Sequence, residues 1–164
     1  MCGIFCVLNN CEIPQSVSGN DETTRIEMNS QNCLDENIIQ CSFEKGKGRG
    51  PEMSKLLNVA DNVTLGFHRL AINGLDDISN QPIEVEGIYL ICNGEIYNYK
   101  LLADINNFKL QSNSDCEIII HMFKKYGFLQ TIEQLDGVFS CILIHNDIMY
   151  VGRDPIGVRP LFTG

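Results

Sequence analysis

The sequence predicts a single α+β domain built from antiparallel sheets. Its 164 residues suffice for one domain with a substantial core and are too few for two ordinary domains. Strand-like runs come first, helical spacing follows, and strand-like runs return near the end of the chain. Because strands and helices do not alternate regularly, this order disfavours a parallel βαβ sheet.

Strands are predicted at three places before residue 93. Residues 3–8 (GIFCVL) form a short apolar run, typical of a buried strand that would hold the terminus in place. Residues 63–70 and 83–92 are rich in β-branched and aromatic residues and also indicate strands. Residues 9–48 are the least patterned part, where we expect a loop with one short helix at most.

Two helices are predicted in the second half. Ser114 and Glu117 have the spacing of a capping box, in which serine caps the helix and the glutamate reaches back. Apolar residues then recur at helical spacing as far as Gly127, a residue type that commonly ends helices. Residues 128–135 indicate a second, shorter helix.

A β-hairpin is predicted near the end of the chain. Residues 138–144 and 148–151 are apolar runs, and the turn-forming residues 145–147 (HND) separate them. The dense proline and glycine of residues 152–161 then predict a tightly turned segment, to which we assign a scaffolding role.

The composition excludes several classes of function. The net charge of −9 and the pI of about 4.7 argue against nucleic acid or an anionic membrane surface as partner. No apolar run approaches the ~18–20 residues that cross a bilayer. The start lacks the pattern of a secretory signal, so we expect a cytoplasmic protein.

The cysteines and histidines do not predict a metal site. The chain has eight cysteines and three histidines, without a Cys-x-x-Cys pair or zinc-finger spacing. Without a secretory signal, disulfides are not expected. We interpret most of the cysteines, Cys92 and Cys116 among them, as small buried packing residues.

Cys2 follows the initiator methionine directly. Removal of Met1 would leave a thiol and a free α-amine on one residue. An α-amine has a pKa near ~7.7–8.0 and can serve as the base that activates the thiol. Most Met-Cys starts have no such meaning, so this reading depends on the rest of the chain.

Three further positions suit the attack of a thiol on an amide. The side-chain amide of Asn93 and the backbone N–H of Gly94 could form an oxyanion hole, although Asn-Gly is also a common turn. Arg69 could grip a carboxylate, although most arginines form surface ion pairs. Asp115, an exposed carboxylate at the first turn of the predicted helix, could accept a hydrogen bond from a substrate ammonium.

Together these segments resemble the glutaminase domain of class II, or N-terminal-nucleophile, glutamine amidotransferases, and most closely its asparagine synthetase branch. The NGEIYN form at 93–98 is typical of that branch. The matching segments occur in the family's order, from one end of the chain to the other. They are MCGIF at 1–5, RGP at 49–51, GFHRLAI at 66–72, NGEIYN at 93–98, SDxE at 114–117, LDGVF at 135–139 and GRDPIGVRPLF at 152–162.

The resemblance implies a fold, a reaction and a set of site residues. The fold would be an αββα sandwich of two antiparallel sheets, and the reaction the hydrolysis of L-glutamine to L-glutamate and ammonia. Cys2 would be the nucleophile, its own α-amine the base, and Asn93 with Gly94 the oxyanion hole. Arg69 would hold the α-carboxylate of glutamine and Asp115 its α-ammonium. Leu70, Ala71, Ile72, Asn73 and Glu95 would line the pocket.

The chain also departs from the family pattern. An insertion is expected within 9–48, and Gly48 stands where the family commonly has histidine before RGP. The ATP-dependent synthetase domain of this branch is not found in residues 1–164, so ATP and Mg²⁺ are expected only there and no cofactor in this chain. The synthetase domain would be a partner in cis or in trans, and a homodimer is an option.

Two alternatives to this reading stay open. The domain could supply ammonia to another acceptor, or it could be a catalytically silent module that binds glutamine for regulation.

Overall fold

The computed structural model of the protein describes residues 2–8, 24–27, 35–70 and 77–162. Two antiparallel sheets stack face to face. The three-stranded sheet has the order β1-β4-β3, with β1 at Gly3–Leu8, β4 at Val63–Arg69 and β3 at Met53–Ala60. The five-stranded sheet has the order β2-β8-β7-β6-β5, with β2 at Thr24–Glu27, β8 at Ile148–Arg153, β7 at Gly137–His145, β6 at Ile88–Ile96 and β5 at Ile83–Val85.

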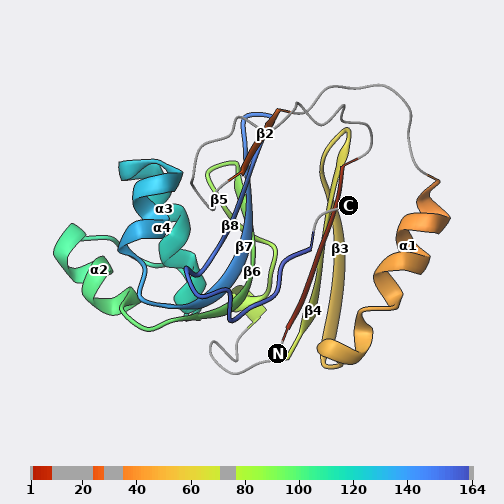
Figure 1. Cartoon of the computed structure of the whole chain (residues 1–164), viewed down its shortest axis with the longest axis horizontal. Helices are drawn as coiled ribbons and strands as arrows, with labels where there is room; N and C mark the ends of the chain where they lie inside the picture. The colour runs from red at the N-terminus through yellow and green to blue at the C-terminus, as the bar shows by residue number, and fades with distance from the viewer. Residues whose placement is uncertain (1, 9–23, 28–34, 71–76, 163–164) are drawn as a thin grey trace.

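Helices cover the outer face of each sheet (Figure 1). Helices α2 (Tyr99–Asn106), α3 (Ile118–Tyr126) and α4 (Phe128–Gln134) lie over the five-stranded sheet, and α1 (Glu36–Glu44) lies beside the three-stranded sheet. This arrangement confirms the predicted α+β class and the αββα sandwich.

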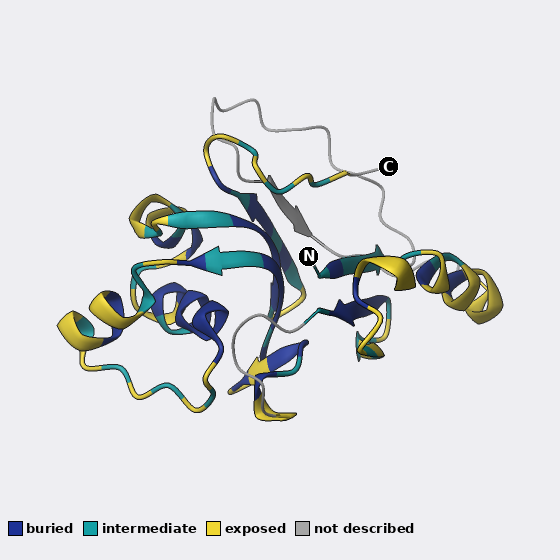
Figure 2. Ribbon diagram, turned by 90° about the horizontal axis from the view of Figure 1, so that it is seen from below, coloured by how far each residue is buried: buried dark blue, intermediate teal, exposed yellow. Residues whose placement is uncertain are grey.

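Two apolar cores hold the layers together, and strand alternation divides residues between them. On β6, Leu90 belongs to the core between the five-stranded sheet and its helices. The next residue, Ile91, belongs to the core between the two sheets, where Val63 and Leu65 of β4 also lie. Figure 2 shows this buried interior from the end of the molecule where the N-terminus lies. Alternate residues of the inner strands therefore point into the space between the sheets.

The predicted strand over 83–92 is wrong as a single element. The chain reverses at Glu86 and Gly87, whose φ angles of 51° and 78° suit a tight hairpin turn, and forms β5 and β6. Strand β6 continues through Ile96, so Asn93 and Gly94 lie within a strand and do not form a turn.

The other strand predictions are confirmed, and several elements were missed. The strand at 3–8, the strand from 63 and the final hairpin are present, the hairpin turning at Asn146 and Asp147 with positive φ angles. The one short helix expected within 9–48 is α1, whose N-terminus is capped by the Asp35 side chain. Most of the predicted insertion there lies outside the described residues. Strands β2 and β3 and helix α2 were not predicted.

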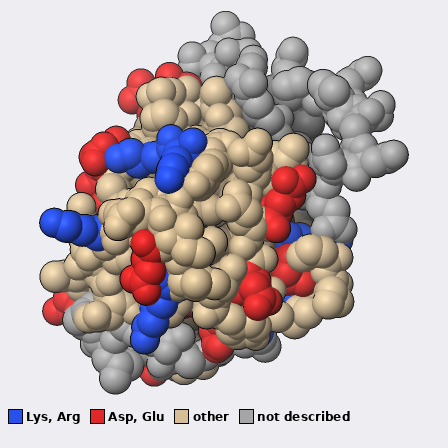
Figure 3. Space-filling model, turned by 90° about the vertical axis from the view of Figure 1, so that its left-hand side faces the viewer, with Lys and Arg blue, Asp and Glu red and all other residues tan. Residues whose placement is uncertain are grey.

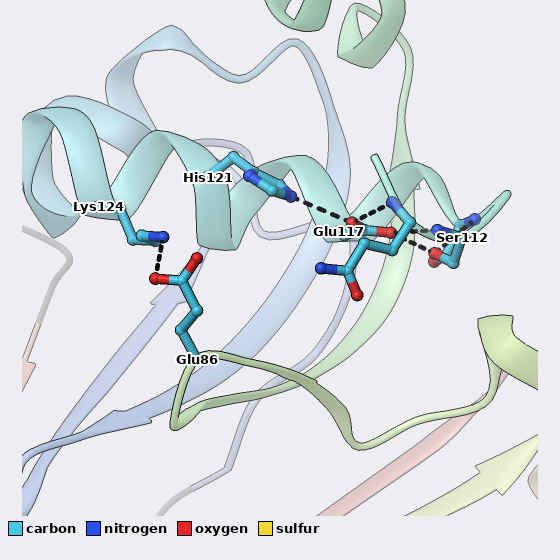
Figure 4. Close-up of polar contacts among 7 residues, drawn as sticks. Glu86, Ser112, Glu117, His121 and Lys124 are labelled. Atoms are coloured by element: carbon cyan, nitrogen blue, oxygen red, sulfur yellow. Dashed lines mark hydrogen bonds and ion pairs between the residues drawn. The ribbon is translucent and has the colours of Figure 1, made fainter. Parts of the chain in front are cut away.

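The predicted capping box is also wrong. Ser114 makes no side-chain capping bond, and a 3-10 turn at Asp115–Glu117 precedes α3. The Glu117 carboxylate instead accepts hydrogen bonds from the backbone N–H groups of Gln111 and Ser112, both at 2.7 Å, and lies 3.1 Å from His121 Nε2 (Figure 4). Glu117 thus joins α3 to the loop before it. The end of the helix at Gly127, with φ of 78°, is as predicted.

Asp154 organises the turned segment after β8. Its side chain is 1% exposed and accepts hydrogen bonds from the backbone N–H groups of Phe139, Ile156, Val158 and Arg159. These bonds tie the segment to β7, in agreement with the predicted scaffolding role.

Candidate active site

The pairing of β1 with β4 places Cys2 at one end of the space between the sheets. Gly3 lies opposite His68 in the antiparallel register, so Cys2 stands beside the end of β4. The Cys2 thiol lies 3.3 Å from the Leu70 carbonyl oxygen, and the Leu70 N–H donates to the sulfur at 3.4 Å. Ile4 and Cys6 pack in the core between the sheets, so alternation turns Cys2 inward as well.

A small cavity at this point collects most of the predicted site residues. Cys2, Arg69, Leu70, Gly94, Glu95 and Asp115 all line it. Asn93 directly precedes Gly94 but does not line the cavity, and Ala71, Ile72 and Asn73 lie outside the described residues. The cavity is also lined by residues that were not predicted as site residues: Phe67, Ser79, Gln81, Cys92, Ser114 and Cys116.

Arg69 is a buried arginine at the inner face of β4. It follows Val63 and Leu65 at even spacing, so it points into the same space as they do, and it is 8% exposed. Its guanidinium donates a hydrogen bond to the side-chain oxygen of Asn80. The alternative of a surface arginine is therefore wrong, and the charge is held at the cavity.

The RGP segment packs directly behind Arg69. A Cβ on Gly50 would come within 2.2 Å of the His68 carbonyl oxygen, which only glycine avoids. The N–H of Glu52 then donates to the Arg69 carbonyl oxygen at 3.2 Å. This close approach fixes the backbone at the end of β4.

The edge of β6 next to the cavity is bonded by side chains instead of a strand. Strand β5 pairs with β6 only as far as Leu90. Beyond that point, Gln81 donates to the Cys92 carbonyl oxygen at 3.0 Å and accepts from the Cys92 N–H at 2.5 Å. Four residues on, the Ile96 N–H donates to the Asp115 carboxylate at 2.6 Å. Because alternate residues of a strand direct their N–H groups to the same edge, the Gly94 N–H points to this edge too.

Gly94 is also required by the packing of the sheet. A Cβ at this position would lie 2.2 Å from the Val138 carbonyl oxygen and 2.5 Å from the Phe139 Cα, both on β7. The neighbouring strand β7 therefore makes a close approach to Gly94 that only glycine permits.

Asn93 occupies the inner face of β6. It follows Ile91 at even spacing and is 5% exposed, opposite Ser140 of β7 in the register. The Ser140 hydroxyl is buried without a hydrogen-bond partner in the described part of the chain. The Asn93 side chain thus leaves the face of β6 toward the space between the sheets, and the Gly94 N–H leaves the adjoining edge of the strand.

Asp115 is buried, at 5% exposure, which corrects the expected exposed carboxylate. Burial raises its pKa, and the hydrogen bond from the Ile96 N–H opposes that rise. The residue still lines the cavity, so a cation that entered could pair with it. Its bond to β6 fixes one carboxylate oxygen and orients the other.

Burial also raises the pKa of the Cys2 thiol, although the Leu70 hydrogen bond and the positive chain terminus lower it in part. A thiol with a raised pKa is protonated at neutral pH and needs a base before it can attack. Cys92 and Cys116 are buried in the core under the helices, as expected of packing residues, although both also reach the cavity wall.

A second cavity, of about 390 Å³, lies on the other side of residues 77–82. It is larger than the cavity at Cys2, but no cysteine or histidine lines it. Ser54, Lys55 and Ser112 are its candidate nucleophiles, but it lacks the cysteine, the buried arginine and the exposed edge of β6 that meet at the Cys2 cavity.

The rest of the described surface shows neither a membrane helix nor a metal cluster. None of the helices in the described ranges has the length and apolar character to cross a bilayer. Nor do His, Cys, Asp and Glu side chains of those ranges gather in threes that could hold a metal ion. Where α2, α3 and α4 face the viewer in Figure 3, basic and acidic side chains are interspersed.

Comparison with known proteins finds one family model over the whole chain. The model described as "Glutamine amidotransferase domain" matches residues 1–164. Similar curated proteins include the "Asparagine synthetase [glutamine-hydrolyzing]" of Mesocricetus auratus, 44% identical over 142 residues and 81% of this chain. The same-named protein of Homo sapiens is 42% identical over 142 residues. The "Probable asparagine synthetase [glutamine-hydrolyzing]" of Acanthamoeba polyphaga mimivirus is 35% identical over 170 residues and 100% of this chain.

The chain spans about a quarter of the length of these curated relatives. The alignment covers 24% of the Mesocricetus auratus and Homo sapiens proteins and 28% of the mimivirus protein.

Proposed function

The chain belongs to the glutamine amidotransferase domain family, and from that premise we propose that it hydrolyses L-glutamine to L-glutamate and ammonia, with Cys2 as the nucleophile. One observation carries the proposal. The Cys2 thiol lines the same cavity as buried Arg69 and buried Asp115. The edge of β6 at Gly94 also faces this cavity.

The charges suit an amino acid bound by its α-carbon end. The Arg69 guanidinium would pair with the α-carboxylate, for which its fork of donors is matched, and Asp115 would accept from the α-ammonium. Leu70 and Glu95 line the same cavity, and we assign Ala71, Ile72 and Asn73 to the pocket wall. With the backbone end held there, the side-chain amide is left to meet Cys2.

The α-amine of Cys2 would act as the base once Met1 is removed. It takes the thiol proton as sulfur attacks the side-chain amide carbon, and the amide oxygen becomes an oxyanion. The Gly94 N–H and the Asn93 amide would stabilise that charge. The proton then passes to the leaving nitrogen, ammonia departs, and water cleaves the γ-glutamyl thioester to glutamate.

We further propose that the ammonia serves asparagine synthesis from aspartate and ATP. This assignment rests on the names of the relatives, of which the chain matches about a quarter. The remaining part of such a protein would bind ATP and Mg²⁺. The cytoplasm is the compartment we propose, because unpaired thiols such as Cys2 stay reduced there.

The test is the release of glutamate and ammonia from glutamine, with the intact mass of the protein recorded alongside. We expect turnover from protein that has lost Met1, and at least a ~10³-fold loss in Cys2→Ser, because a hydroxyl is a far weaker nucleophile here. Full turnover by Cys2→Ser would exclude the proposed nucleophile. Absence of turnover from wild-type protein with a free Cys2 amine would favour a silent glutamine-binding module.

A further inference from the structure

Two adjacent residues, Asn80 and Gln81, bond to residues on opposite sides of the Cys2 cavity, although only Gln81 lines it. They follow the short 3-10 turn at Asp77–Ser79, and neither belongs to a helix or strand. Asn80 accepts a hydrogen bond from the Arg69 guanidinium on β4. Gln81 bonds the backbone of Cys92 on β6. One dipeptide therefore bridges the two sheets at the cavity.

The Gln81 side chain takes the place of a neighbouring strand. Its amide donates to the Cys92 carbonyl oxygen and accepts from the Cys92 N–H, the same pair of bonds that one residue of an antiparallel strand would make. Gln81 is 6% exposed, so both bonds lie out of bulk water. The pairing is limited to one residue of β6.

That limit has a consequence for Gly94. Had β5 continued along this edge, its backbone would cover the N–H groups of β6 in turn. Instead the edge is held at Cys92 by Gln81 and at Ile96 by Asp115, and Gly94 lies midway, about 7 Å from each at ~3.4 Å per residue. Two fixed points thus aim the Gly94 N–H at the cavity while leaving a ligand room to approach.

Asn80 acts on the other side of the cavity. Its side-chain oxygen accepts a hydrogen bond from the Arg69 guanidinium, and its side-chain N–H donates to the Asp77 carboxylate at 3.5 Å. Asn80 is a neutral acceptor, so this hydrogen bond orients the guanidinium without itself neutralising the charge.

We propose that Asn80 and Gln81 are positioning residues with separate tasks: Asn80 sets Arg69 for binding the amino acid, and Gln81 sets the β6 edge for stabilising the oxyanion. The proposal rests on the proposed function of the site. It predicts that substitutions of neighbouring residues change different kinetic constants.

Substitution of Gln81 should lower kcat. Gln81→Glu keeps the size and the acceptor for the Cys92 N–H, but in its ionised form it sets an oxygen against the Cys92 carbonyl in place of the donor, so the kinetics are measured at about pH 8 or above. A displaced oxyanion donor slows the chemical step, so we expect kcat to fall roughly 10- to 100-fold with KM within about threefold of wild type.

Substitution of Asn80 should raise KM instead. Asn80→Ala removes a hydrogen bond that orients the Arg69 guanidinium, so we expect KM for glutamine to rise about tenfold with kcat within about threefold of wild type. Ile78→Ser is the matched control. Ile78 is 69% exposed in the same turn, and both constants should stay within twofold.

A second readout separates positioning from disruption of the fold. Alkylation of Cys2 by iodoacetamide needs no oxyanion hole. Its rate, measured on the peptide that contains Cys2, should therefore be the same in Gln81→Glu as in wild type. Labelling of Cys2 by a diazo ketone analogue of glutamine needs the bound, polarised carbonyl and should slow at least tenfold.

The outcomes distinguish this inference from the proposed function. Wild-type protein that is labelled by the analogue but releases no glutamate would remove the proposed hydrolysis, and slowed labelling in Gln81→Glu would still support the positioning role. Equal losses in kcat, KM and alkylation, or unchanged constants in both variants, would overturn it. So would the absence of any analogue labelling in wild type.

Discussion

Gly94 shows how one residue serves packing and chemistry together. Its missing side chain lets β7 approach, and its N–H points at the cavity beside Cys2. The two requirements act on different sides of the same residue. A substitution at Gly94 therefore lowers the stability of the fold whether or not a ligand is bound.

We predict that Gly94→Ala destabilises the protein by at least about 2 kcal/mol, because its Cβ would meet the β7 backbone and the strands would have to separate. Urea unfolding measures the change. Gly48→Ala is the control: a Cβ there meets nothing within 4 Å, and stability should stay within about 0.5 kcal/mol. Equal stability of the Gly94→Ala protein would show that β6 and β7 are not packed as described.

At the scale of elements, the start of α3 depends on a carboxylate that bonds to residues five and six positions upstream, beyond the N-cap that a capping-box glutamate would reach. Glu117 is 1% exposed and accepts bonds from the loop that leads into the helix (Figure 4). Burial alone would raise its pKa, but the bonds from His121, Gln111 and Ser112 outweigh burial and lower the pKa to about 2.

Glu117→Gln should cost about 2–4 kcal/mol of stability, since an amide offers one acceptor where the carboxylate offers two and turns its own N–H groups toward donors. Thermal or urea unfolding against Glu133→Gln, an exposed site on α4, gives the comparison. A loss no greater than that of the control would mean that the buried carboxylate does not hold the loop.

The sequence predicted elements well where a local pattern and the final fold agreed. The apolar runs of β1 and β4 and the Asn146-Asp147 turn needed no distant partner to be recognised. The break at Glu86 was missed because the residues on both sides of it continue one apolar run. The capping box was misassigned because the bonds of Glu117 go to a loop whose path the spacing does not encode.

The same limit applies to the site. Motif residues such as Arg69, Gly94 and Asp115 could be found from the sequence, and they meet at one cavity. Gln81 could not be found, because its role comes from where β5 ends and not from a local pattern. The burial of Asp115 was missed for the same reason: the covering strand is 19 residues away.

At the scale of the whole molecule, the buried carboxylates set the response to acid. Glu117 and Asp154 both have pKa values below the ordinary range, Asp154 because backbone N–H groups outweigh the effect of its burial. A lowered pKa in the folded state adds stability above the unfolded pKa, and that stability is lost as pH falls through the folded value. Asp115, with a raised pKa, acts in the opposite sense and offsets part of the loss.

We therefore expect stability to hold down to about pH 4.5 and to fall between there and about pH 2, with Glu117 alone contributing about 3 kcal/mol. Urea midpoints measured across this range test the expectation. In Glu117→Gln the decline should be shallower by about that amount. An identical decline in variant and wild type would place the acid sensitivity elsewhere.

The pairing of β1 with β4 also bears on when Met1 is removed during synthesis of the chain. Once β1 is hydrogen-bonded into the sheet, Gly3 is buried, and the Cys2 α-amine of the proposed mechanism lies directly beside that buried position. Arg69 is synthesised 67 residues after Cys2, an interval of roughly 3–13 s at ~5–20 residues per second. Cleavage of the methionine within that interval would precede the pairing of β1 with β4, so we expect slow processing to leave a larger share of chains with a blocked amine.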